Sequence, residues 1–389
     1  MTNTLLYLLS FLLPMLMVPV VLPSVALMAK KKRMVDAPNS RKLQAAPVFV
    51  MGGMVFLPVL CVTLMVANIF HNIDILFPAV CVIVVLFSLG ILDDGIGLNW
   101  RIKLLVQTLV VLLLFLCGGY RIQTLEGLFG VYELPYWVSL ILSLFIGLMF
   151  INAFNFIDGV DGLASALGIF SGIVLGVWDV RHVYIEHAVL SFAVSGALFS
   201  FFFFNVFSER YKMYLGDSGS LVLGIFAYIS ICSTAHAVPD LSFLADQYAV
   251  SFFIAIFSVV LFDLARVVLM RILKGRSPFM PDRRHIHHLM VDLGCSHLMA
   301  TLLILITNAC VILVWYLTAK SGMNVEMQFF IVFVSAALLV WGPCAALELL
   351  RARKPRLYVR MSSRVCRLAA KTNRFHGAIR RFVDRDRRK

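Results

Sequence analysis

The chain has 389 residues, of which 61% are hydrophobic and only 14% are charged, and its mean hydropathy is +0.92. A water-soluble domain of this size cannot bury so much apolar surface, so the composition excludes a soluble enzyme and predicts an integral membrane protein. The net charge of +13 would suit a nucleic-acid partner, but the positions of the basic residues argue against one.

Eleven apolar runs follow one another along the chain, most of them close to the roughly 20 residues that a helix needs to cross the hydrocarbon core. The runs lie at 4–29, 48–68, 75–92, 103–117, 136–153, 163–180, 187–206, 218–237, 248–272, 298–319 and 328–350. They predict an all-α integral membrane protein with about eleven transmembrane helices at 1–350, followed by a basic tail at 351–389. The first run lacks a basic n-region and exceeds the usual signal-peptide core, so an anchor is favoured over a cleaved signal peptide.

The lysines and arginines are distributed unevenly between the two sides of this bundle. If the KKKR motif at 30–33 faces the cytoplasm, 31 of the 34 basic residues lie on that side, and only Arg121, Arg181 and Lys320 lie outside. Because cytoplasmic loops of membrane proteins are enriched in basic residues, the N-terminus is predicted outside and the C-terminus in the cytoplasm.

Acidic residues gather at helix ends that this topology places on the cytoplasmic side. Three loops, reading ILDDGIGLNWRIK, NAFNFIDGVDGLAS and YLGDSGSLVLG, contribute Asp93, Asp94, Asp158, Asp161 and Asp217. Five carboxylates at one face repel each other unless a cation lies among them, and carboxylate oxygens suit Mg²⁺ or Mn²⁺. Ionisable groups are expensive at membrane depth, so a cytoplasmic active-site cleft is favoured over the alternative that Asp158, Asp161 and Asp217 only cap helices.

A second polar cluster follows the ninth apolar run on the same predicted side. It reads RRHIHHLM and contains Arg283, Arg284, His285, His287 and His288. The H-x-H-H spacing without acidic partners is poor for zinc, whereas arginine side chains fit a diphosphate well. We favour anion binding over a transition-metal site or a solvated basic loop.

The tail carries 15 basic residues interleaved with leucine, valine, phenylalanine and isoleucine. This pattern favours an amphipathic segment on anionic membrane lipid over plain disorder, and nucleic-acid binding ranks last.

The motifs LDDGIGLNWRIK, NAFNFIDGVDGLAS, MYLGDSGSLVLG and RRHIHHLM occur in this order and on one predicted face. Together they resemble the polyprenyl-phosphate N-acetylhexosamine-1-phosphate transferase family, and HIHH is closer to its WecA-like branch than to its MraY branch. The resemblance covers all eleven runs and leaves out the tail. It implies Mg²⁺-dependent transfer of a sugar 1-phosphate from a UDP-N-acetylhexosamine to polyprenyl (undecaprenyl) phosphate, with release of UMP. It places this step, which starts a lipid-linked cell-envelope glycan, at the cytoplasmic face of the bacterial inner membrane.

The resemblance also implies roles for individual residues. Asp93 and Asp217 would lie near the metal, Asp94 beside the acceptor phosphate, and Lys103 would face the phosphates; with His287, these four form the candidate catalytic set. The nucleoside pocket would be lined by Asn152, Asn155, Asp158, Asp161, Asn205 and Tyr214, the last stacking on uracil. The diphosphate or sugar would be held by Arg283, Arg284, His285, His287 and His288.

The segment DAPNSRKLQAAP, with Asp36 and Lys42, resembles the family's first cytoplasmic loop. It departs from the family pattern at Gln44, where many relatives have histidine, and at Phe49, where proline is frequent. These departures weaken the roles of Asp36 and Lys42 in the predicted site.

The acceptor is a phosphate monoester with a second pKa near ~6, so it is already mostly ionised at neutral pH and a general base has little to remove. Direct attack by the lipid phosphate is therefore favoured over a phospho-aspartate intermediate on Asp94. An MraY-like transferase of peptidoglycan synthesis and, from another class, a secondary transporter are the alternatives. GlcNAc is the sugar that the resemblance implies, and a homodimer remains open.

Overall fold

The computed structural model describes residues 3–31, 35–36, 48–50, 52–234, 248–277 and 284–384. The helices are α1 (Asn3–Lys31), α2 (Gly53–Phe70), α3 (Phe77–Ile96), α4 (Trp100–Cys117), α5 (Tyr136–Ile157), α6 (Leu163–Arg181), α7 (Ile185–Phe207), α8 (Gly216–Thr234), α9 (Ala249–Ile256), α10 (Ser258–Leu273), α11 (Ile286–Asp292), α12 (His297–Lys320), α13 (Val325–Arg353) and α14 (Pro355–Val383). Short strands are β1 (Val35–Asp36), β2 (Val48–Val50) and β3 (Met213–Tyr214). Single 3-10 turns lie at Asp74–Leu76 and Leu128–Gly130.

The helical character predicted from the apolar runs is confirmed. Within the described residues, ten helices are long and apolar enough to cross a membrane, and the bent pair α9–α10 would make eleven. The outer helices carry the expected apolar surface: on α4, Leu105, Leu109 and Leu113 are exposed, while Val110 and Leu114 are buried. A continuous leucine stripe facing outward is compatible with lipid and unsuited to water.

The ninth run does not form the single span that was expected. Its axis bends by 76° at Phe257, between α9 and α10. A bend frees backbone groups that must find partners in an apolar setting. Asn308 of α12 supplies them, because its Nδ2 donates to the Ile256 carbonyl at 2.8 Å and its Oδ1 accepts from the Val259 N–H at 3.3 Å.

A small sheet, which the all-α prediction did not include, joins distant parts of the chain. β2 pairs antiparallel with β1 and parallel with β3, so that Val50 lies opposite Tyr214. The run expected to begin at residue 48 therefore starts as a strand, and its helix begins at Gly53. The strands fasten the first loop to the segment that leads into α8.

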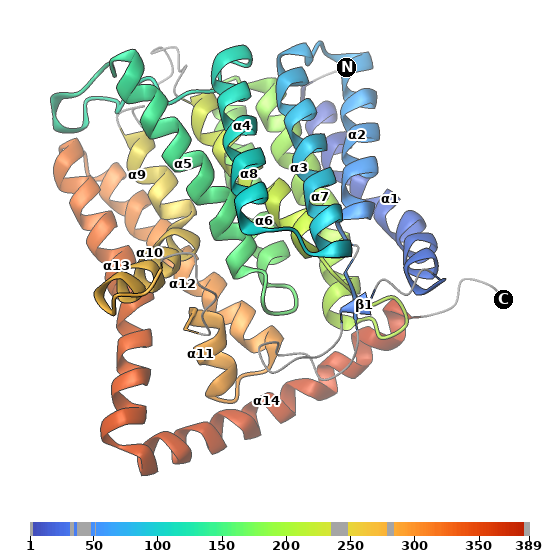
Figure 1. Cartoon of the computed structure of the whole chain (residues 1–389), viewed down its shortest axis with the longest axis vertical. Coiled ribbons are helices and arrows are strands. Elements are labelled where there is room, and N and C mark those ends of the chain that lie inside the picture. The colour runs from blue at the N-terminus through green and yellow to red at the C-terminus, as the bar shows by residue number, and fades with distance from the viewer. Residues whose placement is uncertain are drawn as a thin grey trace.

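α8 is the central helix, and 89% of the residues in Gly216–Ser233 are buried. It packs against α3 and α5, while α7 packs against α1 and α6. Figure 1 shows β1, α11 and α14 at the same end of the bundle, with α14 running obliquely across that end. The candidate site residues lie toward this end, because α3 ends and α8 begins there.

Candidate active site

Three helices bring two carboxylates and one ammonium group together. Lys103 Nζ, in the first turn of α4, donates to Asp93 Oδ2 at 2.9 Å and to Asp217 Oδ2 at 2.5 Å. Asp93 lies in the last turn of α3 and also accepts the Leu98 N–H at 2.7 Å, which closes the α3–α4 turn. Asn155 of α5 donates to Asp217 Oδ1 at 2.8 Å. The arrangement aims two carboxylate oxygens at a single cation.

The neighbouring carboxylate, Asp94, points elsewhere. Its Oδ1 accepts the Asp217 N–H at 3.0 Å, and its Oδ2 accepts the N–H and hydroxyl of Ser218 at 3.2 and 3.0 Å. The first N–H groups of a helix have no partner within the helix, so a carboxylate stabilises them by capping. Asp94 thus caps α8 from a different helix and ties α3 to α8 beside Asp217.

Gly90 makes this close approach of α3 and α8 possible. A Cβ at this position would lie 2.3 Å from both N and Cα of Ser218. The backbones of the two helices are therefore in contact one turn from Asp93 and Asp94.

Replacing Gly90 with alanine is expected to push α3 away from α8 and to separate Asp93 and Asp94 from their partners. We expect turnover to fall at least about a hundredfold, together with a loss of roughly 2 kcal/mol of stability. Thermal unfolding in detergent and UMP release measure the two effects. Gly342→Ala is the matched control, because a Cβ there meets no atom within 4 Å; equal losses in both variants would contradict the packing argument.

The donor set fits Mg²⁺ with few protein ligands. The described residues contain no group of three or more histidine, cysteine, aspartate or glutamate side chains placed to hold a metal. Mg²⁺, however, is usually bound by one or two carboxylates together with substrate phosphates and water. The oxygens of Asp93 and Asp217 that share the Lys103 ammonium group meet this requirement.

Asp158 and Asp161 lie in the turn between α5 and α6. α5 ends at Ile157, and α6 begins at Leu163 after Gly162, whose φ of +80° is unfavourable for residues with a side chain. Neither aspartate caps α6. Burial, and then the negative charges of Asp217 and Asp94, raise the pKa of Asp158 to about 8. Asp158 is therefore mostly protonated at neutral pH, which reduces the repulsion among the five acids.

Asp161 has its own basic partners. Lys212 Nζ lies 2.6 Å and His297 Nδ1 lies 3.0 Å from Asp161 Oδ2. Burial alone would raise the pKa of Asp161, but the hydrogen bonds and charges of His297 and Lys212 outweigh it and lower the pKa. Asp161 Oδ1 is buried and has no hydrogen-bond partner among the described residues. This oxygen can accept one further donor.

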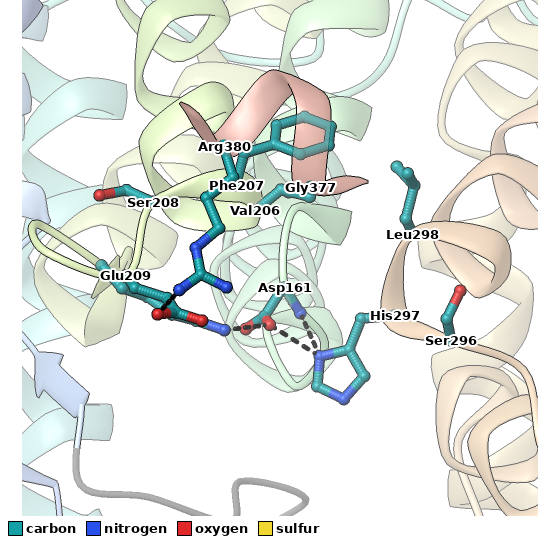
Figure 2. A pocket seen from close by; sticks show the side chains of 11 residues that line it. Asp161, Val206, Phe207, Ser208, Glu209, Ser296, His297, Leu298, Gly377 and Arg380 are labelled. Atoms are coloured by element: carbon teal, nitrogen blue, oxygen red, sulfur yellow. Dashed lines mark hydrogen bonds and ion pairs between the residues drawn. The ribbon is translucent and has the colours of Figure 1, made fainter. Parts of the chain in front are cut away.

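Asp161 lines a cavity of about 560 Å³ on the side of the bundle reached by α14. The lining residues are Asp161, Val206, Phe207, Ser208, Glu209, Lys212, Ser296, His297, Leu298, Gly377 and Arg380. Figure 2 shows the Asp161 carboxylate turned toward His297, with Glu209 and Arg380 on the other side.

Three of the residues assigned to the nucleoside pocket have partners within the protein or belong to its small sheet. Asn152 Nδ2 donates to Gln107 Oε1 and to the Leu148 carbonyl. Asn205 Oδ1 accepts the Gly162 N–H at 2.5 Å, and its Nδ2 donates to the Met213 carbonyl at 2.7 Å. Tyr214 belongs to β3. Asn205 therefore joins the 158–162 turn to the strand that leads into α8.

The histidine loop is anchored to α10 by an acid that the sequence analysis missed. His285 Nδ1 lies 2.8 Å from Asp263 Oδ2, and Asp263 Oδ1 accepts from Arg266 Nη2 at 3.0 Å and from the Ile286 N–H at 2.9 Å. The Arg284 carbonyl accepts a further hydrogen bond from Arg266. The histidine loop therefore has an acidic partner, but Asp263 is hydrogen-bonded to only one of its histidines, His285.

His287 is fully buried beneath the acidic turn. A Cβ at Gly159 would lie 2.5 Å from its Nε2, and its ring stacks on His285 and contacts His288. Burial, followed by the neighbouring histidines, lowers the pKa of His287 well below its usual value. Its ring nitrogens have no hydrogen-bond partner within the described chain. In the predicted anion role, His287 would act as a neutral N–H donor.

Some of the predicted site residues lie outside the described structure, and some residues found at the site were not predicted. Lys42, Arg283 and the side chain of Asp36 belong to the first group. Lys212, His297 and Asp263 belong to the second. A carboxylate inside an apolar run is itself a functional signal, and Asp263 in the run 248–272 could have been found that way.

The chain is similar to a known protein family and to several individual enzymes. Residues 75–235 match the model of glycosyl transferase family 4, a range that contains all five predicted aspartates. The chain is 29% identical over 322 residues to the undecaprenyl-phosphate alpha-N-acetylglucosaminyl 1-phosphate transferase of Escherichia coli (strain K12), covering 81% of this chain and 84% of that protein. It is 28% identical over 325 residues to the protein of the same name from Yersinia pestis, covering 81% and 85%.

A further relative has a different lipid in its name. The chain is 29% identical over 245 residues to the decaprenyl-phosphate N-acetylglucosaminephosphotransferase of Mycobacterium tuberculosis, covering 58% of this chain and 60% of that protein. These similarities confirm the resemblance indicated by the four motifs.

Proposed function

We propose that the protein transfers N-acetylglucosamine 1-phosphate from UDP-GlcNAc to a polyprenyl phosphate such as undecaprenyl phosphate and releases UMP. The convergence of Asp93 and Asp217 on one cation carries this proposal. The names of the relatives supply the sugar and the lipid. The product would be the first intermediate of a lipid-linked glycan.

The main barrier is repulsion between an anionic lipid phosphate and an anionic diphosphate. Asp93 and Asp217 would hold Mg²⁺, whose positive charge would offset the negative charge of the diphosphate and of the departing UMP. Lys103 adds a positive charge at a position fixed by three helices, and His287 adds an N–H donor below the 158–162 turn. These groups stabilise charge that develops during the transfer.

The contacts of Asp94 favour direct attack over a phospho-aspartate. In direct attack, an oxygen of the lipid phosphate bonds to the sugar-linked phosphorus, the bond from that phosphorus to the bridging oxygen breaks, and UMP leaves with the electron pair. Both carboxylate oxygens of Asp94 already accept hydrogen bonds from α8. Hydrogen bonds to both oxygens make the Asp94 carboxylate a weaker nucleophile. They suit a role in which Asp94 positions the start of α8 beside the acceptor phosphate.

The proposed location is the inner membrane, with the site facing the cytoplasm. The motivating observation is that Lys103 lies with the acids at one end of the bundle, and that the basic helix α14 crosses this same end (Figure 1). Single cysteines at Arg101 and Arg210, in a background without native cysteines, should resist an impermeant thiol reagent in intact cells. Cysteines at Asp74 and Glu126 should react with it. The reverse labelling would put the acids on the wrong side for UDP-sugars.

Purified protein with UDP-GlcNAc, undecaprenyl phosphate and Mg²⁺ should release UMP and form a sugar-diphosphate lipid. UDP-GalNAc tests the choice of sugar, and a UDP-sugar precursor of peptidoglycan tests the MraY-like alternative. Turnover of the precursor alone would replace the proposed reaction by that alternative. If no UDP-sugar is turned over, and the protein instead moves a solute across the membrane of proteoliposomes without releasing UMP, the transporter alternative is favoured.

A further inference from the structure

The basic tail forms a long helix that returns to the bundle. α14 follows α13 after Lys354 and packs against α13 at one end and α7 at the other. Between these ends, Ser362 and Cys366 lie against Gly294, just before α12. Figure 1 shows α14 crossing the end of the bundle that carries β1 and α11. The tail therefore spans the end where the acids lie.

The far end of α14 is fixed to the turn between α7 and β3. Asp384 accepts from the Ser208 hydroxyl at 2.5 Å and from the Glu209 N–H at 3.1 Å. The guanidinium group of Arg380 pairs with Glu209. These four residues are called the latch. They join the last turn of α14 to the segment that also carries Lys212.

The latch closes one wall of the Asp161 cavity. Gly377 and Arg380 of α14 line this cavity together with Asp161, Lys212 and His297. Its volume of about 560 Å³ lies within the range of small-molecule sites. The buried Asp161 Oδ1, which has no hydrogen-bond partner among the described residues, can accept a hydrogen bond from a ligand in the cavity. Without α14 the cavity would be more open to water, which would weaken polar contacts inside it.

We propose that α14 is a wall of the nucleotide-binding pocket and that its latch sets the affinity for the uridine nucleotide of the donor. The choice of nucleotide rests on the proposed function. The tail is then a part of the donor site, and its contacts with the Ser208–Glu209 turn govern the fit of UMP and UDP-sugars. A membrane-surface role for its basic residues is the competing assignment.

Charge reversal tests the latch. Arg380→Glu places a carboxylate beside Glu209, and Glu209→Arg places a guanidinium beside Arg380, so each single variant repels where the wild type attracts. We expect the Kd for UMP and the KM for UDP-GlcNAc to rise about tenfold in each, with kcat within about twofold of wild type. The double variant Glu209→Arg/Arg380→Glu should return both values to within about threefold of wild type.

The matched control is Arg360→Ala, which removes a positive charge from an exposed position on the same helix. It should leave UMP binding and turnover unchanged. Asp384→Asn provides a second, isosteric test, expected to raise the Kd for UMP without changing the oligomeric state or Tm. All variants are measured in detergent by calorimetry with UMP and in vesicles containing anionic lipid.

Normal UMP binding in both single variants, or no recovery in the double variant, overturns the proposal. An equal defect in Arg360→Ala, seen only in anionic vesicles, assigns the tail to the membrane surface and also overturns it. The proposed function fails separately: the wild type would then turn over no UDP-sugar, while the pattern of UMP binding across the variants still decides the role of the latch.

Discussion

Replacing Asp217 with asparagine is expected to lower turnover by roughly a thousandfold at ordinary Mg²⁺ concentrations. Asparagine keeps the size of the side chain but removes the negative charge that faces Lys103 and, in the proposed reaction, Mg²⁺. Weaker metal binding can be offset by mass action, so part of the activity should return at high Mg²⁺ or with Mn²⁺. UMP release at increasing metal concentrations measures both effects.

Ser220→Ala is the control for this experiment. Ser220 accepts a hydrogen bond from Asn155 at 3.0 Å but carries no charge, so its loss should change turnover only a few-fold. Normal turnover in Asp217→Asn would show that the convergence of Asp93 and Asp217 on a cation has no part in the reaction, and the proposed function would lose its main support.

Asp94→Asn is expected to be as inactive as Asp217→Asn, but no metal concentration should rescue it. The amide can accept hydrogen bonds through one atom only, so it cannot hold both the Asp217 N–H and the Ser218 N–H as the carboxylate does. Loss of a helix cap costs about 1–2 kcal/mol, and a lower Tm should accompany the loss of activity. UMP binding should survive, because Asp94 does not line the Asp161 cavity.

Ser218→Ala separates capping from chemistry. It removes the hydroxyl donor and leaves both N–H groups on Asp94, so a small drop in Tm and nearly normal turnover are expected. A large metal-dependent recovery of Asp94→Asn, combined with none in Asp217→Asn, would exchange the roles proposed for the two residues.

The sequence was sufficient for the features that depend on local pattern. Apolar runs such as 136–153 and 163–180 predict helices because a membrane admits few alternatives, and the structure has helices there. The convergence of Asp93, Lys103 and Asp217 also followed, in outline, from the expectation that their loops share one side.

The features that were missed depend on distant partners. Nothing near Phe257 in the sequence marks a break, because Asn308, far along the chain, satisfies the freed backbone. The strands are too short to leave a periodic pattern. The cap on α8 comes from Asp94 of α3, whereas sequence reasoning looks for a cap just before its own helix. The return of α14 depends on Ser208, which follows α7 and is distant in sequence from α14.

The central position of α8 has a consequence for biosynthesis. The charged centre of Asp93, Lys103 and Asp217, with Asn155, is built on α3, α4, α5 and α8, which all precede residue 235, while the histidine loop and α14 are translated later. Because chains emerge from the ribosome N-terminus first, the carboxylates and Lys103 can assemble while His287 and Arg380 are still unmade. The nascent protein therefore acquires its charged centre first and its covering parts last. A ribosome paused once α8 has emerged would hold a fragment with Asp93, Lys103 and Asp217 together and the donor pocket still open.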